Sequence, residues 1–198
     1  MEPNKRFIIK PYFFTNENEL DKNPFHYTDV LTYVGIKSFD NLKGNCFPSQ
    51  ETIAETIGTS KKFVIPSVER LEASGYLEVY RSKIIRVVNR YFFPEPKSFQ
   101  KIPYEVLKCN DLNHNEKAML LLVRELSLTP HDLIGTRTEL ALRLGMGYSM
   151  FNTQFEKLIA KGYIMQEGKS RFRLLRIDWH IPDIEKQPDK NKYIFVLG

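Results

Sequence analysis

Two stretches of the sequence gather basic, hydroxyl and amide side chains. The first set is Ser60, Lys61, Lys62, Arg81, Lys83, Arg86 and Arg90, with the aliphatic Ile65 among them. The second set is Tyr148, Ser149, Asn152, Thr153, Gln154, Lys169, Arg171 and Arg173. Lysine and arginine neutralise phosphates, lysine can also pair with guanine, and asparagine and glutamine amides can pair with adenine. We therefore expect the residues near 60–65 to hold phosphates and those near 148–154 to read bases. Lys169, Arg171 and Arg173 are expected to point toward a phosphate strand.

The charge of the chain is concentrated in these stretches. Residues 60–97 carry eight basic and four acidic side chains, and residues 147–176 carry six basic and two acidic ones. The whole chain has a net charge of +5, so the remaining residues are acidic on balance. A basic excess confined to such segments is typical of proteins that bind nucleic acids.

The elements that must position these residues occur twice. The residues Ala54, Gly58, Glu69, Leu71, Gly75 and Tyr76 recur 87 residues later as Ala141, Gly145, Glu156, Leu158, Gly162 and Tyr163. A further set, Phe7, Pro11, Tyr12 and Leu20, recurs 92 residues later as Phe99, Pro103, Tyr104 and Leu112. An internal repeat in a sequence indicates that the fold contains repeated structural units. We predict two copies of one module, with five extra residues of the first copy in residues 39–47, between its first and second helices.

Local signals define each module. Ser49 is a candidate helix cap and Gly58 a candidate helix end, and Ser60 can cap a second helix that buries Val64, Val68 and Leu71. Residues 76–80 and 84–93 are β-prone and predict a hairpin. In the second copy, Phe151, Phe155 and Leu158 are predicted to face inward, and Ser149, Asn152, Thr153 and Gln154 outward or at the flank. Pro66 falls inside the first of these longer helices, at a cost of about 3 kcal/mol unless the helix bends or starts later.

The pattern Phe47-Pro48-Ser49, Ile53-Ala54, Gly58, Ser60, Val64, Val68, Leu71 and Gly75-Tyr76-Leu77, followed by Asn89, Tyr91 and Phe93, resembles the winged helix-turn-helix proteins of phages and plasmids. That family includes replication initiators and domains fused to helicase loaders. The resemblance implies a mostly α protein with small β-hairpin wings, an α+β fold of two tandem winged helix-turn-helix domains. It also implies that the second helix of each pair enters the DNA major groove and that the hairpin contacts the flanking backbone.

The other segments complete this organisation. We expect domains at residues 1–94 and 99–182, a linker at 95–98 and a tail at 183–198, with a shared interface because each half is small. Residues 7–14 are expected to form an edge strand or arm, and a first helix to start at Asn23-Pro24. Asn113 and Glu116 form a predicted capping box before a helix that is apolar on several faces; it packs between domains, between protomers or in a plain core. The apolar residues 193–198 either return to their own core or add to a partner's sheet.

The sequence does not favour catalysis. Its four histidines are scattered, and no glycine-rich phosphate loop or nucleophile elbow is present. We therefore expect no enzymatic activity, no cofactor and no metal. Two cysteines, no signal peptide and no apolar run of about 20 residues predict a cytoplasmic protein without a membrane segment.

These expectations converge on a protein that binds double-stranded DNA. The resemblance points to a replication initiation protein of the phage or plasmid type. A transcriptional regulator, or a winged-helix scaffold that binds protein instead of DNA, remains open as an alternative. Further partners are equally open: a homodimer on palindromic half-sites, a monomer with two heads on a direct or asymmetric site, and replication or transcription proteins.

Overall fold

The structure is a computed structural model that describes residues 26–40, 46–81, 88–94, 99–127, 129, 131–177, 179 and 193–197. The first half contains α1 (Asp29–Lys37), α2 (Gln50–Ile57), α3 (Lys61–Ala73), β1 (Glu78–Tyr80) and β2 (Arg90–Phe92). The second half contains β3 (Phe99–Pro103), α4 (Glu105–Lys108), α5 (His114–Glu125), β4 (Asp132–Ile134), α6 (Arg137–Arg143), α7 (Tyr148–Ala160), β5 (Ile164–Gln166), β6 (Arg171–Leu174) and β7 (Tyr193–Leu197). This mixture of helices and small antiparallel sheets confirms the α+β class.

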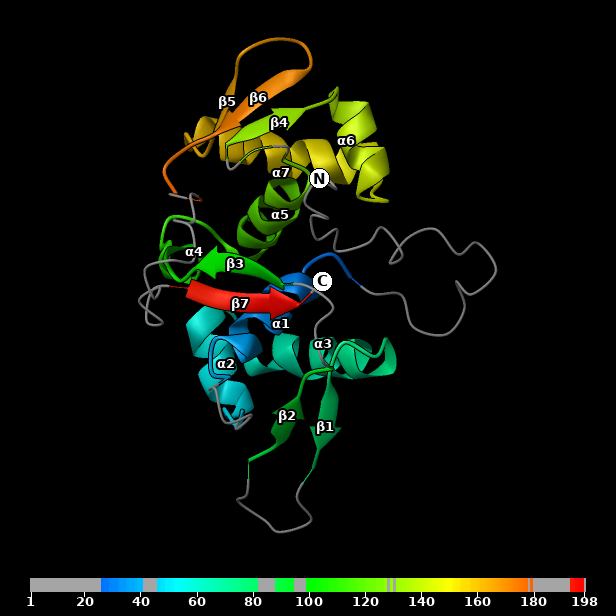
Figure 1. Cartoon of the computed structure of the whole chain (residues 1–198), viewed down its shortest axis with the longest axis vertical. Coiled ribbons are helices and arrows are strands. Elements are labelled where there is room, and N and C mark those ends of the chain that lie inside the picture. The colour runs from blue at the N-terminus through cyan, green and yellow to red at the C-terminus, as the bar shows by residue number, and fades with distance from the viewer. Residues whose placement is uncertain are drawn as a thin grey trace, which may run out of the picture.

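The same order of elements occurs in both halves. Helix α2 begins at residue 50 and α6 at residue 137, and α3 spans residues 61–73 where α7 spans 148–160. Each recurrence is 87 residues apart, as the sequence repeat predicts. Each pair of helices is followed by an antiparallel hairpin, β1–β2 or β5–β6. In Figure 1 the two hairpins lie at opposite ends of the long axis of the molecule.

The first helices of the two halves follow the same spacing. The backbone N–H of His26 donates to Asp29 Oδ2 at 2.8 Å, and that of Asn113 donates to Glu116 Oε2 at 2.9 Å. Because both pairs are also 87 residues apart, the change of offset falls before residue 26. The prediction of five extra residues between the first and second helices is therefore wrong. The predicted start at Asn23-Pro24 is wrong too, because residues 26–28 are not helical and α1 begins at Asp29.

One short strand went unpredicted. Strand β4 pairs with β6 and makes a three-stranded sheet in the order β4-β6-β5. Its counterpart in the first half is a single contact, in which the N–H of Tyr91 donates to the carbonyl of Cys46 at 2.8 Å. Three residues with one buried side chain, Leu133, are too few to show a strand period in the sequence.

The halves share a hydrophobic core. Helix α5 packs against α7 of its own half and against α1 of the other half, and α5 and α1 lie between the two ends of the molecule (Figure 1). Residues 116–123 of α5 are all buried. Two hydrogen bonds also cross between the halves, from Tyr27 Oη to Asn115 Oδ1 at 2.8 Å and from Tyr104 Oη to the Ser38 carbonyl at 2.8 Å. The expectation of a shared interface is confirmed.

The C-terminal strand closes on its own chain. Strand β7 pairs with β3 in an antiparallel register that runs from Phe99 opposite Leu197 to Pro103 opposite Tyr193. Of the two alternatives for residues 193–198, the structure therefore shows the return to the chain's own fold. The linker 95–98, residues 7–14 and residues 183–192 lie outside the described residues.

Candidate nucleic-acid interface

The first half presents α2 and α3 joined by a three-residue turn. The Ser49 hydroxyl accepts the N–H of Thr52 at 3.0 Å and begins α2, as predicted. Gly58 ends α2 with φ of 72°, a left-handed conformation in which glycine meets no Cβ penalty. Ser60 lies at the predicted cap of α3, but its side chain makes no capping hydrogen bond. The tight turn therefore fixes the angle between the two helices through backbone geometry.

Helix α3 is held on the core by its apolar stripe and by one buried ion pair. The side chains of Val64, Val68 and Leu71 are buried, as predicted. Beside them, Arg70 donates to both carboxylate oxygens of Asp29, and the Ser67 hydroxyl donates to Asp29 Oδ1 at 2.6 Å. This network leaves the opposite face of α3 free to meet a ligand.

Pro66 lies within α3 without ending it. The helix starts at Lys61 and continues to Ala73, so it does not start later than predicted. Since proline has no N–H, the carbonyl of Lys62 lacks its usual donor four residues on. Pro66 is half-buried, next to the stripe that packs on the core.

The start of α3 carries the basic residues of this interface. Lys61 and Lys62 are both exposed, and Ile65 is partly buried. Lys61 Nζ lies 2.5 Å from Glu51 Oε1 on α2, and this hydrogen bond lowers the pKa of Glu51. Lys62 makes no ion pair with the part of the chain that the structure describes. Lys62 is thus free for a phosphate, whereas Lys61 must first leave a solvent-exposed pair that is worth about 0–1 kcal/mol.

The hairpin of the first half adds two arginines. Arg81 follows β1 and reaches back to Glu72 on α3, with N–O distances of 2.9 and 2.5 Å. Arg90 on β2 is exposed and forms no ion pair with a described residue. Lys83 and Arg86 lie outside the described residues.

The corresponding start of α7 differs in chemistry. Tyr148 and Met150 are 51% and 46% exposed, and Leu142 on α6 is 76% exposed. Ser149 is exposed as predicted. The residues 87 positions earlier than Tyr148 and Leu142 are Lys61 and Glu55, so apolar side chains stand where the first half has charges.

Two of the predicted base-reading amides are engaged or buried. Arg137, the first residue of α6, donates to Asn152 Oδ1 at 3.0 Å, to Gln166 Oε1 at 2.9 Å and to Glu156. Gln154 is only 7% exposed, so the prediction that it lies outward or at the flank is wrong.

The reason for this burial is helical geometry. Gln154 is three residues after Phe151 and four before Leu158, which places it on the buried stripe of α7. The hydroxyl of the exposed Thr153 donates to the Ser149 carbonyl at 2.8 Å. Among the amide and hydroxyl side chains predicted to contact DNA in this half, Tyr148 and Ser149 are exposed and make no side-chain hydrogen bond with a described residue.

The second hairpin is largely neutralised within itself. Arg171 lies 3.2 Å from Glu167, and Arg173 lies 3.1 Å from Glu167 and 3.9 Å from Asp132. Lys169, at the predicted tip, is exposed and has no ion pair within the described residues. The second half therefore offers fewer free cations than its basic sequence implies.

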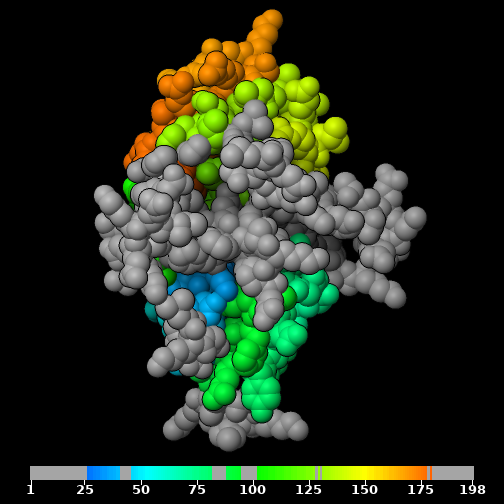
Figure 2. Space-filling view, in the orientation of Figure 1, coloured from blue at the N-terminus to red at the C-terminus, as the bar shows by residue number. Residues whose placement is uncertain are grey.

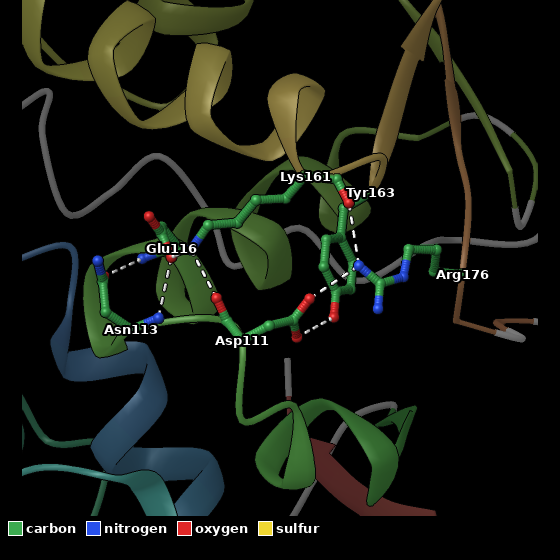
Figure 3. Close-up of polar contacts among 6 residues, drawn as sticks. All are labelled: Asp111, Asn113, Glu116, Lys161, Tyr163 and Arg176. Atoms are coloured by element: carbon green, nitrogen blue, oxygen red, sulfur yellow. Dashed lines mark hydrogen bonds and ion pairs between the residues drawn. The ribbon is translucent and has the colours of Figure 1, made fainter.

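A polar cluster fixes the end of α7 to the loop before α5 (Figure 3). Asp111 accepts from Tyr163 Oη at 2.7 Å and from Arg176 at 2.8 Å, and these contacts lower its pKa. Lys161 Nζ lies 2.6 Å from Glu116 of the predicted capping box, which is confirmed. Arg176 has a positive φ of 64°, rare for a residue with a side chain, and its guanidinium lies over the Tyr163 ring. The cluster joins the end of α7 and the residues after it to the loop before α5 and to the first turn of α5.

Sequence reasoning missed the acidic partners of the basic residues. Glu51, Glu72 and Glu167 each hold a cation that was predicted to meet DNA. Glu167 and Arg171 face each other across the turn of the predicted hairpin, so the hairpin itself was a signal for this pair. The other two pairs span ten and nine residues and depend on the turn angles.

Comparison with protein families bears on the first half of the chain. A family model described as a helix-turn-helix domain matches residues 28–77, from the start of α1 to the residue before β1. Residues 28–77 are therefore similar to a helix-turn-helix domain, which supports DNA binding. In such domains the second helix of the pair contacts DNA, and α3 occupies that position. No curated protein and no solved structure matched the chain.

Two further findings concern other kinds of site. Within the described ranges, no helix is both long and apolar enough to cross a membrane. The same residues contain no group of three or more histidine, cysteine or acidic side chains placed to hold a metal ion.

Proposed function

We propose that this protein binds double-stranded DNA in a sequence-specific manner through the helix-turn-helix of its first half, and that it acts as a replication initiation protein of the phage or plasmid type. The observation that carries the proposal is the exposed, basic start of α3 in a helix-turn-helix domain, with Lys62 free of ion pairs among the described residues. In this arrangement α3 enters the major groove, and Arg81 and Arg90 of the hairpin approach the flanking backbone.

The repeated order of elements supports the finer description as two winged helix-turn-helix modules. Each half has a helix, a two-helix unit and an antiparallel hairpin, and the two-helix units are related by a spacing of 87 residues. The hairpins lie at opposite ends of the long axis (Figure 1). A duplex that contacts both hairpins must therefore run along that axis. Such a duplex suits an initiator that binds an asymmetric or repeated site with two winged helix-turn-helix modules. The proposed activity is the recruitment of replication proteins in the cytoplasm, and it needs no catalytic residue.

A second role is favoured for the second half. Leu142, Tyr148 and Met150 expose apolar side chains at the α6–α7 turn. Leu142 and Tyr148 stand where the first half carries charges. Apolar side chains at this position suit a protein partner better than a phosphate backbone. The second half can therefore act as the adaptor that contacts replication or transcription proteins, or a second copy of the chain.

Binding-site selection from a random duplex pool tests the proposal. The selection is run at two salt concentrations. The proposal expects one enriched motif and a log–log salt slope near −5 for about six phosphate contacts. Short repeated units within the motif favour an initiator, whereas a single palindromic operator favours a transcriptional regulator. Retention that does not depend on salt, or no retention, would refute duplex binding.

A further inference from the structure

The solvent face of the first hairpin carries a second kind of nucleic-acid chemistry. We propose that this face binds single-stranded DNA by stacking exposed aromatic rings on unpaired bases. This inference rests on the proposed function, because the choice of DNA as ligand comes from the helix-turn-helix. The surface itself is separate from the start of α3.

The strand pattern places two aromatic rings and one cation on the same face. Tyr80 on β1 is 64% exposed and Phe92 on β2 is 44% exposed, whereas Tyr91, between Arg90 and Phe92, is buried. Tyr80 pairs with Arg90, and Glu78 pairs with Phe92. Tyr80 and Phe92 are therefore diagonal neighbours, a relation in which side chains lie about 7–8 Å apart.

A third ring flanks Arg90 from the other side. The N–H of Tyr91 donates to the Cys46 carbonyl, and the side chains of Cys46 and Tyr91 are both buried. The next residue, Phe47, is 55% exposed. Its equivalent in the second half is Ile134, which pairs with Arg171 in the register between β4 and β6. The same register in the first half sets Phe47 beside Arg90, so that the cation lies between Tyr80 and Phe47.

The positive charge of Arg90 on this face is available to a phosphate. Arg90 makes no ion pair within the described residues, whereas its equivalent Arg171 is paired with Glu167. The equivalent of Tyr80 in the second half is Glu167 itself, 87 residues later, and Phe92 corresponds to Arg173. The first hairpin thus exposes rings where the second exposes a mutually neutralising ion-pair network.

This pattern matches the chemistry of an unpaired strand. Successive bases of single-stranded DNA offer flat faces that are separated by phosphates, and binding proteins meet them with aromatic rings and basic residues. Bases inside a duplex already stack on their neighbours and offer no such face. Glu78 pairs with Phe92 and is a diagonal neighbour of Arg90, but the two side chains form no ion pair.

The test uses the full chain and two labelled probes in fluorescence anisotropy. One probe is oligo(dT) of about 12 nucleotides, within the site sizes of single-strand binding folds, and the other is the duplex found by site selection. The variant Tyr80→Ala/Phe92→Ala keeps Arg81, Arg90 and the start of α3, which are the duplex contacts of the proposed function. It is therefore expected to bind oligo(dT) at least tenfold more weakly and to lose little affinity for the duplex. The variant Tyr80→Phe/Phe92→Tyr keeps both rings and should retain oligo(dT) binding. The control variant Ile134→Ala/Met165→Ala removes exposed apolar side chains of the second hairpin sheet and should change neither affinity.

Several results would overturn the inference. These are a wild type that does not bind oligo(dT), an alanine variant that binds it unchanged, and an aromatic-retaining variant that loses as much affinity as the alanine variant. A wild-type dimer that becomes monomeric in the alanine variant, with oligo(dT) affinity unchanged, would assign the face to protein contacts instead. Thermal unfolding of each variant checks that it is folded. The proposed function is judged with the duplex probe and this inference with oligo(dT), so the two can fail separately.

Discussion

Arg70 on α3 donates two hydrogen bonds to the carboxylate of Asp29 on α1, at 2.8 and 2.7 Å, and Asp29 is completely buried. The Ser67 hydroxyl adds a third bond to the same carboxylate. The pair fixes α3 on α1, the first helix of its half. In the second half, Glu116 at the equivalent position of α5 also receives a cation, Lys161 from the end of α7.

Replacing Asp29 with alanine should lower the free energy of unfolding by about 3–5 kcal/mol, because the substitution leaves Arg70 and Ser67 without their buried acceptor. Urea denaturation followed by circular dichroism measures this change. Glu72→Ala is the matched control: it removes an arginine partner that is solvent-exposed, and it should cost less than about 1 kcal/mol. Equal losses in the two variants would contradict a special role for the buried pair.

The sequence predicts helix caps and buried helix faces well, because the residues that specify them lie within a few positions of one another. Ser49, Gly58 and the capping box at Asn113 and Glu116 act within one helical turn, so their residue types specify their conformation. The apolar stripe of α3 is predicted equally well because its period matches that of the helix.

The features that the sequence did not predict depend on contacts between elements that are distant in sequence. Gln154 is polar and falls on the buried stripe of α7, a placement that its residue type does not indicate. Arg137 joins α6, α7 and β5, and this becomes visible only when the turn angles are known. Strand β4 is stabilised by β6, some forty residues later, rather than by its own sequence. The basic residues of the site could be identified from the sequence, but their ion-pair partners could not.

The pH dependence of stability should reflect two histidines near the contact between the halves. Burial lowers the pKa of His114, and His26 lowers it further; burial is also the main cause of the lowered pKa of His26, against a smaller raising effect of Asp29. Because the folded state binds these protons less readily than the unfolded state, stability is complete above the ordinary histidine pKa of 6.5 and falls as the pH drops below it.

The measurement is the urea midpoint between pH 8 and pH 5, for the wild type and for His114→Gln. The variant should show a shallower loss on acidification, since one of the two protonation sites is gone. His131→Gln is the control, because His131 directly precedes β4 and belongs neither to α1 nor to the start of α5. A wild type that gains stability on acidification from pH 7 to pH 5 would contradict the sign.

Close packing of α1 on α2 should make Gly35 intolerant of a side chain. A Cβ at this position would lie 2.5 Å from Ile57 Cγ2, closer than any real contact of this kind. Gly35→Ala should therefore destabilise the protein by about 1–3 kcal/mol, although alanine favours helix more than glycine does. Gly168→Ala provides the comparison, because a Cβ there meets nothing within 4 Å and Gly168 does not have a positive φ, so thermal unfolding should show no loss of stability. A Gly35→Ala protein as stable as the Gly168→Ala protein would show that α1 and α2 can separate.

The ion pairs of α3 predict unequal contributions of its two lysines to duplex binding. Lys62 is free among the described residues, so Lys62→Ala should weaken binding to all sequences alike and reduce the magnitude of the log–log salt slope by about 0.9. Lys61 forms an ion pair with Glu51 at 2.5 Å, so Lys61→Ala should have the smaller effect.

Glu51→Gln tests whether this ion pair weakens the contribution of Lys61. The substitution releases Lys61 and removes a negative charge beside the DNA backbone, so it should tighten binding. Lys108→Ala on α4 serves as a control for net charge. If Lys61→Ala weakens binding more than Lys62→Ala, or Glu51→Gln weakens it, the duplex does not approach the start of α3 in the manner proposed.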